Sequence, residues 1–474
     1  MSNKNENVNV RALKAGLWYT ICNVLIRGIN FLTTPIFTRI LSKSDYGMYS
    51  NYATWLGLLT TLTTLDLYVS VARAKFDYKE DIDGYISSIQ ALGTLFTAVC
   101  YLIVCLFSSF FKKLFGLDMI YIHIMFLYLL VSPAFQILQE KHRQFMKYKL
   151  VTMLTITSMI LTIIFSLILV LTMENKLLGR VIGNTVVLFC ICLVIYAYNI
   201  IRGKRVDLKD WKYALLIAVP YIPHILAGNI MGSTDKIIIT HYWGAEYNAL
   251  YSIVFTVSLV VTMVGSSVNQ AWSPWLFEKL SAKSYKEIRK VTKYYIYVTM
   301  PVMGCVFLIG SELIRVFGGE SYMECASIVP CIMMGCYMMI LYTFFVNVEM
   351  YHKKTFGISI RTIIAGSFNL ITNIIFIPMF GYTAAAYTTL ASYILLFILH
   401  YIGGISLGAR NFYDLKQFIL CAVIMLCFMF VSLSLYNHTI LRYIMLLVIV
   451  ISMLVIIIMN RAWITEKIKA YMNR

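Results

Sequence analysis

The sequence predicts an all-α polytopic membrane protein with about fourteen transmembrane helices. Two observations lead to this fold class: long apolar stretches fill the chain, and its basic residues fall in alternate gaps between them. Of the 474 residues, 60% are hydrophobic and only 13% are charged. This composition excludes a soluble globular protein.

Each apolar stretch is long enough to cross a hydrocarbon core about 30 Å thick, which takes about 20 helical residues. The polar segment 1–11 has no cleavable signal pattern, and the apolar run that follows continues as a full span. In chain order the predicted spans are 12–38, 48–71, 85–111, 118–138, 150–172, 177–201, 213–239, 248–277, 294–317, 325–348, 357–378, 381–405, 416–436 and 439–460.

Lys and Arg concentrate in every second gap between these spans. One set of alternate segments holds 29 of the 40 basic residues, and the other set holds 8. The remaining three are Arg27, Lys236 and Arg361, which lie inside spans or at their edges. Cytoplasmic loops carry an excess of Lys and Arg. The alternation therefore predicts an even number of helices and two cytoplasmic termini.

The gaps are too short to hold a soluble domain. The longest, 139–149, 202–212 and 278–293, are basic and predicted to be cytoplasmic. The external gaps are tight, such as 379–380 and 437–438. A membrane glycosyl polymerase usually needs a large external loop for its active site, so the short external gaps argue against this class.

A weak internal repeat divides the chain. Segment 38–50 reads TRILSKSDYGMYS and segment 240–252 reads THYWGAEYNALYS, an offset of 202 residues or six helices. Because six is even, both copies enter the membrane in the same orientation, as in a parallel repeat about an axis along the membrane normal. We expect two six-helix lobes and two extra helices: 1–205 with helices 1–6, 206–409 with helices 7–12, and 410–474 with helices 13–14 and a cytoplasmic tail.

No pattern in the chain indicates catalysis or a bound metal. The seven histidines are isolated, and the eleven cysteines follow no metal-ligand spacing. We find no Ser/His/Asp arrangement and no nucleotide-binding loop. The net charge of +18 is spread over short loops, which favours anionic lipid headgroups over nucleic acid. We therefore expect no enzyme, no catalytic residue and no cofactor, and energy from a Na⁺ or H⁺ gradient, the membrane potential or consumption of the product.

Five short segments resemble one known family. They are PIFTRILSKSDYGMYS at 35–50, STDKIIITHYWGAEYNALYS at 233–252, ESYMECASIVPCIMMG at 320–335, YHKKT at 351–355 and GYTAAAYTT at 381–389. In this order they resemble the polysaccharide flippases of the multidrug/oligosaccharidyl-lipid/polysaccharide (MOP) superfamily, the Wzx-like translocases of O-antigen or capsule repeat units. Two departures concern helix starts: Asn248 stands where the family usually has glycine, and Thr383-Ala384 replace a usual glycine step.

The resemblance implies a MATE-like fold of two lobes around a central cavity. It also implies a transporter that flips an undecaprenyl-diphosphate-linked oligosaccharide from the cytoplasmic to the external leaflet for surface polysaccharide synthesis. Polysaccharide polymerase and glycosyltransferases would be partners, together with membrane lipids. A lipid-linked peptidoglycan precursor flippase and a cation-coupled drug exporter of the same fold remain alternatives.

Ionisable side chains inside the membrane are the candidate site residues, because burying a charge in lipid is costly. A diphosphate needs fixed cations, and arginine matches its oxygens with a two-pronged donor. Arg27, Lys236 and Arg361 are therefore candidate substrate-binding residues. The structural alternatives are an Arg27–Asp66 ion pair, a Lys236 that reaches to the interface beside Asp235, and an Arg361 that anchors the cytoplasmic boundary.

Two carboxylates and one helix bend complete the candidate site. Asp66 and Asp235 are candidate ion-coupling residues or counter-ions, because intramembrane carboxylates commonly couple transport to a gradient. Pro35 lies in the outer third of the first span and removes a backbone hydrogen bond, with Gly28 two turns earlier. A bend there would gate the cavity, and the structural alternative is a static kink.

Overall fold

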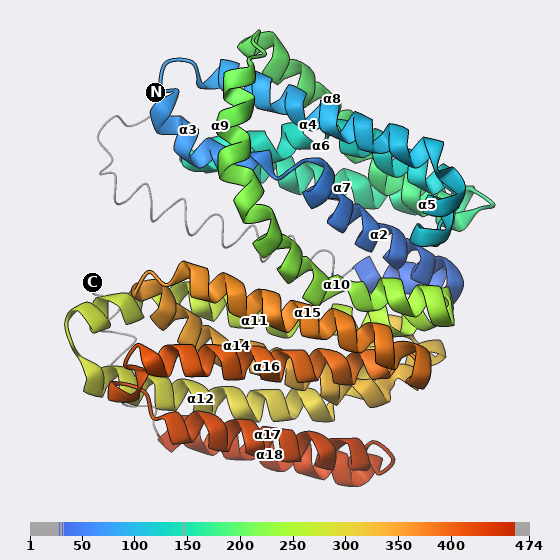
Figure 1. The fold of residues 1–474 in the computed structure, drawn as a ribbon. Coiled ribbons are helices and arrows are strands. Elements are labelled where there is room, and N and C mark those ends of the chain that lie inside the picture. Colours follow the sequence, from blue (N-terminus) through green and yellow to red (C-terminus); the bar gives the residue numbers. More distant parts are fainter. Residues whose placement is uncertain (1–27, 29–30, 32, 146, 460–474) are drawn as a thin grey trace. The chain divides into compact units, whose positions relative to one another are not determined.

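The computed structural model describes residues 28, 31, 33–145 and 147–459 (Figure 1). Within these ranges all regular structure is helical, which confirms the all-α fold class. Every predicted span from 48–71 onward coincides with helix. The first predicted span, 12–38, lies mostly outside the described residues, and 33–40 form its described helical end.

Ten described helices are long and apolar enough to cross a membrane, judged by length and composition. A bent pair of helices adds an eleventh, and 439–455 form a shorter apolar helix. The chain is therefore a multi-pass membrane protein, and fourteen is an approximate count of its spans.

The described chain separates into two units by its internal contacts. Unit 1 comprises residues up to Thr256 and Thr362–Ala385, and unit 2 comprises Val257–Arg361 and residues from Ala386 onward. The helices α11 (Ala245–Ser281), α15 (Thr355–Phe380) and α16 (Ala384–Ser406) have residues in both units. This is a division by packing, and the three-part division expected from the repeat stays a prediction.

Unit 1 is a bundle in which α8 packs on α6 and α7, α4 on α6, and α2 on α10. Its core lies between α2, α4, α6 and α8, where Tyr52, Met125, Phe126 and Val181 are almost completely buried. The elements that lie wholly in unit 1 are α2 (Lys43–Thr63), η1 (Leu67–Ser70), α3 (Val71–Asp77), α4 (Ile82–Leu106), α5 (Ser108–Phe115), α6 (Met119–Gln144), α7 (Tyr148–Thr172), α8 (Lys176–Gly203), α9 (Leu208–Ala218), η2 (Val219–Tyr221) and α10 (Ile222–Trp243).

Unit 2 is built around α14, which forms one span with η3. In the apolar 18-residue stretch of this span, 83% of the residues are buried inside the protein, whereas only 22% are buried in the corresponding stretch of α7 in unit 1. A helix enclosed to this degree is a central helix, whereas α7 presents most of its apolar side chains outward, as lipid contact requires. The elements that lie wholly in unit 2 are α12 (Tyr285–Leu308), α13 (Gly310–Gly318), η3 (Glu320–Ile328), α14 (Val329–Tyr351), η4 (Ala409–Asn411), α17 (Leu415–Leu435) and α18 (Thr439–Met459).

Several predicted spans are not continuous helices. The span 48–71 breaks after Thr63, where Leu65 and Asp66 have positive φ and the helix turns by 48°. The preceding Thr60, Thr63 and Thr64 hydroxyls donate to carbonyls four residues earlier, a bond that often bends helices. The span 213–239 divides into α9, η2 and α10, because Pro220 and Pro223 supply no N–H donor. The spans 85–111 and 294–317 also break, after α4 and α12.

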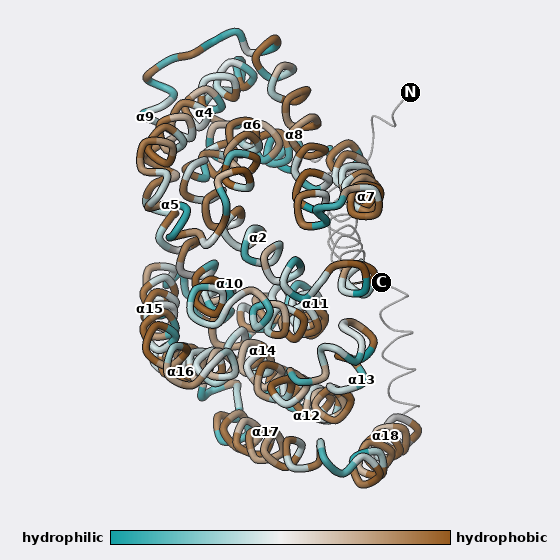
Figure 2. Tube along the Cα trace, turned by 90° about the vertical axis from the view of Figure 1, so that its right-hand side faces the viewer, coloured by the Kyte–Doolittle hydropathy of each residue, from teal (hydrophilic) through white to brown (hydrophobic). Residues whose placement is uncertain are grey.

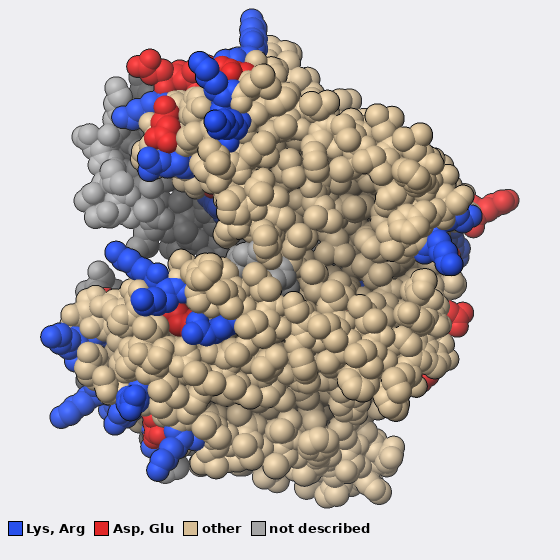
Figure 3. Space-filling model, in the orientation of Figure 1, with Lys and Arg blue, Asp and Glu red and all other residues tan. Residues whose placement is uncertain are grey.

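The basic loops are shorter than predicted because the helices continue past the apolar stretches. Only 282–284 separate α11 from α12, where the sequence predicts a loop over 278–293. Hydropathy marks where a helix leaves lipid, whereas Lys, Arg and Glu are good helix formers in water. Figure 2 shows helices such as α7, α15 and α17 largely in the brown of hydrophobic residues. In Figure 3 the charged side chains of each unit gather at helix ends, next to a wide uncharged surface.

Candidate functional site

The candidate residues fall into separate environments. Arg27 lies outside the described residues. Gly28, Pro35, Asp66, Asp235 and Lys236 belong to unit 1, and Arg361 belongs to unit 2. Each unit therefore holds its own candidate charges.

Asp235 is the centre of a buried polar cluster in unit 1. Its side chain on α10 is 2% exposed. One carboxylate oxygen accepts a hydrogen bond from the Tyr251 hydroxyl of α11, and the other accepts one from the Asn373 amide of α15. Asn373 also donates to the side-chain oxygen Oδ1 of Asn369 at 3.1 Å. Three helices thus converge on one carboxylate, and each of its oxygens accepts a hydrogen bond from a neighbouring helix.

Lys236, the next residue on α10, faces an aromatic ring. Its ammonium lies 4.4 Å from the centroid of Phe255 on α11. A cation over an aromatic face is attracted by the ring quadrupole. The side chain is thus held inside unit 1 by the Phe255 ring, and its charge also interacts with the carboxylate of the neighbouring Asp235.

Asp66 occupies the break between α2 and η1. It has a left-handed backbone with φ of 44° and is 3% exposed. Its Oδ2 has no hydrogen-bond partner among the described residues. Burying a carboxylate oxygen without a hydrogen-bond donor costs free energy. We therefore expect this oxygen to bind a proton, a cation or a donor outside the described ranges. The predicted Arg27–Asp66 pair lies outside the described residues on its Arg27 side.

Gly28 and Pro35 both lie in helical backbone. A side chain at Gly28 would meet nothing within 4 Å among the described residues. The carbonyl of Pro35 accepts hydrogen bonds from Arg39 Nη1 at 2.7 Å and Thr38 Oγ1 at 3.2 Å. The helix continues through Pro35, and the proposed bend stays a prediction.

Arg361 in unit 2 belongs to a triad of ionisable residues, two of which are completely buried. Its Nη1 lies 3.2 Å from Oε1 of Glu349, which is completely buried at the end of α14. The other Glu349 oxygen lies 2.9 Å from Nδ1 of His400 on α16, which is also completely buried. A side chain at Gly403, one turn after His400, would overlap Glu349 Oε1 and lie 2.7 Å from Arg361 Cζ. Gly403 therefore leaves the space that the ion pair occupies.

Arg180 is a cation that the sequence analysis did not name as a candidate. Its guanidinium, in the first turns of α8, lies 3.6 Å from the ring centroid of Phe37 and 4.5 Å from that of Tyr49. Its Nε and Nη1 atoms are buried and have no acceptor among the described residues. Buried donors of this kind need an acceptor, and a phosphate oxygen suits a guanidinium.

The two copies of the repeat contact each other inside unit 1. Ser50 Oγ and Ser252 Oγ are 2.6 Å apart, and Asn248 Nδ2 donates to the carbonyl of Gly47 at 2.8 Å. A side chain at Gly47 would overlap the carbonyl of Ala245. Asn248, which departs from the family pattern, lies inside the regular helix α11 and supplies a hydrogen bond that glycine could not.

For the triad in unit 2, the sequence analysis identified Arg361 as a charged candidate but not the residues with which it interacts. His400 is isolated along the chain, and its link to Glu349 crosses 51 residues. The available signal was that Glu349, Arg361 and His400 are three ionisable residues in or beside adjacent apolar spans. Buried charges need partners, so such residues are candidates for one another.

Comparison with known proteins supplies the family. A family model described as polysaccharide biosynthesis protein matches residues 12–280. The chain belongs to this family. It is also 25% identical over 396 residues to an uncharacterized membrane protein of Haemophilus influenzae, covering 76% of this chain and 91% of that protein. The Lsg locus putative protein 1 of the same organism is 23% identical over 285 residues, covering 58% of this chain and 68% of that protein.

Solved structures of low identity share the fold of this polysaccharide biosynthesis family member. The lipid II flippase MurJ in an inward closed conformation has a TM-score of 0.70 and 17% identity, covering 94% of this chain and all of that chain. An inward-facing multidrug resistance MATE family transporter of the MOP superfamily has a TM-score of 0.54 and 12% identity, covering 83% of this chain and 99% of that chain. The predicted MATE-like fold is confirmed by these similarities.

Proposed function

We propose that this transporter flips an undecaprenyl-diphosphate-linked oligosaccharide repeat unit from the cytoplasmic to the external leaflet for surface polysaccharide synthesis. The observation that carries the proposal is Arg180, a guanidinium fixed on two aromatic rings whose buried Nε and Nη1 lack an acceptor among the described residues. A diphosphate carries the oxygens that such a group binds. A cationic drug would be repelled by it.

Further cations extend the proposed substrate site. Arg27 and Lys236 are proposed to contact the diphosphate, and the Lys236 ammonium lies over the ring of Phe255 in unit 1. Arg361 is a weaker candidate, because Glu349 already compensates its charge at 3.2 Å. For Arg361 we favour a role in holding α14, α15 and α16 together.

Transport is proposed to draw on a Na⁺ or H⁺ gradient. Asp235 supports this, because it is a buried intramembrane carboxylate, and such carboxylates commonly couple transport to a gradient. Asp66 is the second candidate, because its buried Oδ2 has no partner among the described residues. Gly28 and Pro35 are proposed to allow the first helix to bend during the cycle.

The second candidate function is flipping of a lipid-linked peptidoglycan precursor. It is favoured by the structural similarity to the MurJ lipid II flippase, although 17% identity supports the fold alone. The substrates of both candidate functions carry a polyprenyl diphosphate, so the same cations could bind either substrate. Polysaccharide polymerase and glycosyltransferases are proposed partners of the first function only.

The proposed site of action is the bacterial plasma membrane with both termini in the cytoplasm, as the 29-to-8 distribution of basic residues predicts. Reporter fusions after residues 145, 207 and 285 should report cytoplasm, and fusions after 115 and 244 should report the outside. A fusion after 207 that reports the outside would contradict the topology.

The function is tested by deleting the gene in its host. Surface polysaccharide should disappear while lipid-linked repeat units accumulate on the cytoplasmic face, and expression of the chain from a plasmid should restore export. Accumulation of lipid-linked peptidoglycan precursor instead would select the second candidate. Unchanged surface polysaccharide and unchanged pools of both lipids would reject both functions.

A further inference from the structure

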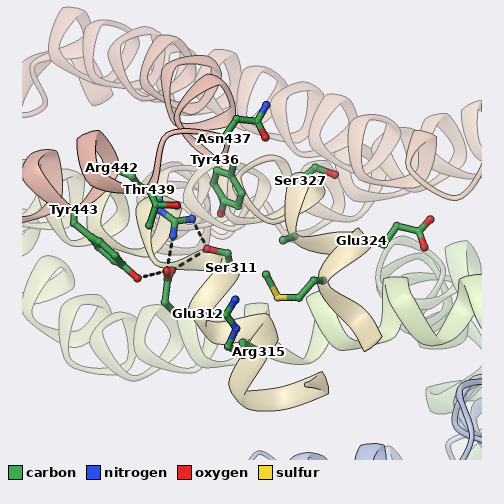
Figure 4. Close-up of a pocket in the computed structure, with 12 residues that line it drawn as sticks. Ser311, Glu312, Arg315, Glu324, Ser327, Tyr436, Asn437, Thr439, Arg442 and Tyr443 are labelled. Carbon is green, nitrogen blue, oxygen red and sulfur yellow. Dashed lines mark hydrogen bonds and ion pairs between the residues drawn. The ribbon is translucent and has the colours of Figure 1, made fainter. Parts of the chain in front are cut away.

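A polar pocket in unit 2 lies away from all the candidate residues described above. It has a volume of about 310 Å³ and lies between α13, η3 and the turn that joins α17 to α18 (Figure 4). The predicted topology places this turn on the external side of the membrane. The volume lies at the lower end of the range of small-molecule sites, about 300–1,000 Å³. It would suit a ligand of roughly one or two sugar rings.

The base of the pocket is a fixed network around Arg442 of α18. This side chain is 4% exposed, and its guanidinium donates to Ser311 Oγ and Glu312 Oε1 of α13. Tyr443 donates to the same Glu312 oxygen at 2.6 Å (Figure 4). The guanidinium lies 5.3 Å from the Tyr436 ring centroid and 5.4 Å from that of Tyr443. Arg442 is thereby locked between two helices and two rings.

One donor of this network is left over. Arg442 Nε is buried and has no hydrogen-bond partner among the described residues. A buried guanidinium N–H without an acceptor is uncommon, and it indicates that a ligand or water oxygen completes the site. Because Arg442 lines the pocket, an oxygen bound there is the natural acceptor.

The charges of the pocket disfavour a phosphate. Arg442 is compensated by Glu312, and Arg315 is compensated by Glu320 at 2.7 Å. Glu324 adds a further negative charge to the lining. The pocket thus offers no excess positive charge for an anion, in contrast to Arg180 in unit 1.

The rest of the lining suits a neutral ligand rich in hydroxyl groups. Ser327, Asn437 and Thr439 bring both donors and acceptors to the pocket from η3 and the α17–α18 turn (Figure 4). Tyr436 and Tyr443 add aromatic rings with polar tips, which can contact an apolar ring face and a hydroxyl together. The Tyr436 hydroxyl is anchored on the carbonyl of Phe307 at 2.9 Å, so its ring position is fixed.

We propose that this pocket is a binding site for a neutral saccharide, of the size of a hexose or N-acetylhexosamine unit. The site is additional to the phosphate-binding cations and does not depend on the proposed transport function. A chain that handles glycans would gain from such a site a contact to sugar rather than to lipid.

The test is saturation-transfer nuclear magnetic resonance on the full chain in phospholipid nanodiscs, because maltoside detergents would themselves supply sugar. The probes are methyl glycosides of glucose, galactose, mannose, N-acetylglucosamine and N-acetylgalactosamine, with glycerol 1-phosphate in parallel. Ser327→Trp fills the pocket, and Ser321→Trp is the matched control, an exposed serine of the same η3 element outside the lining. We expect transfer to at least one glycoside in the wild type and control, reduced about tenfold in Ser327→Trp.

A second pair of variants protects the test against misfolding of the tryptophan variant. Asn437→Ala removes a lining amide and should weaken binding about fivefold, the size expected for one hydrogen bond. His438→Ala, in the same turn but outside the lining, should leave binding unchanged. The proposal is overturned by transfer to no glycoside, by equal transfer in both members of each pair, or by transfer to glycerol 1-phosphate alone. None of these results bears on export, so the proposed function is tested separately.

Discussion

Ser50 on α2 and Ser252 on α11 lie 2.6 Å apart, and they are equivalent positions of the two repeat copies, 202 residues apart. The two repeat copies therefore contact each other in unit 1. The division of the chain into two lobes related by the repeat stays a prediction. The neighbouring bond from Asn248 to Gly47 holds the same pair of helices together.

We predict that Ser50→Cys/Ser252→Cys forms a disulfide on oxidation and stops transport. The hydroxyl oxygens already lie at hydrogen-bond distance, so small adjustments bring two sulfurs into bonding range. Export of surface polysaccharide should fall on oxidation and recover on reduction. Each single cysteine variant under the same oxidant is the control for the native cysteines. Full cross-linking with undiminished export would show that these helices need not separate during the cycle.

Gly403→Ala should destabilise unit 2. The added methyl group would overlap Glu349 Oε1 and force the Glu349–Arg361 pair apart, leaving a buried charge uncompensated. Loss of a buried pair costs about 3 kcal/mol or more, reduced here because Arg361 is partly exposed. The melting temperature in detergent should fall by several degrees. Gly57→Ala is the matched control in α2, where a side chain meets nothing within 4 Å and alanine should be neutral or slightly stabilising. Equal melting temperatures for both variants would contradict the role given to Gly403.

The helical architecture could be predicted from hydropathy because lipid imposes one rule, about twenty apolar residues in a helix. The breaks inside the spans escaped this rule. At Asp66 the cause is local, a run of threonines whose hydroxyls bond back to the helix, and hydropathy does not register it. At Pro220 and Pro223 the cause is visible in the sequence, because both are residues without an N–H donor inside the predicted span 213–239.

The site was only partly predictable for a different reason. Because burying a charge is costly, the sequence identifies Asp235 and Arg361 as residues that need partners. It does not identify those partners, because they lie on other helices. Asn373 lies 138 residues from Asp235, and Glu349 meets both Arg361 and His400 from helices that follow it. Arg180, three residues into the predicted span 177–201, was not among the candidate residues. Its stacking on Phe37 and Tyr49 depends on tertiary structure.

Arg180→Ala should abolish export while the protein still reaches the membrane in normal amounts. If Arg180 binds the diphosphate, Arg180→Lys should recover little, because lysine lacks the planar two-pronged donor and stacks less well on Phe37. Lys176→Ala is the control, a basic residue one turn earlier on α8 whose ammonium caps the carbonyl of Ile40 at 3.2 Å. It should export normally. Export by Arg180→Ala at the level of the Lys176→Ala control would remove Arg180 from the site.

Asp235→Asn should abolish the dependence of transport on the coupling ion. The substitution keeps the size of the side chain but removes the negative charge on which Tyr251 and Asn373 converge. An asparagine also presents an NH₂ group to donors, so one of the two bonds is lost. Transport in proteoliposomes would be measured with a Na⁺ gradient, a proton gradient or neither. Wild-type protein should respond to one gradient, and Asp235→Asn should transport at the gradient-free rate under all three conditions. Tyr251→Phe is the matched control: it removes a donor but keeps the carboxylate charge, so the response to the gradient should persist with altered ion affinity. A wild-type response retained in Asp235→Asn would place ion coupling elsewhere, and the same measurement on Asp66→Asn would then decide whether the buried oxygen at the α2 break takes that role.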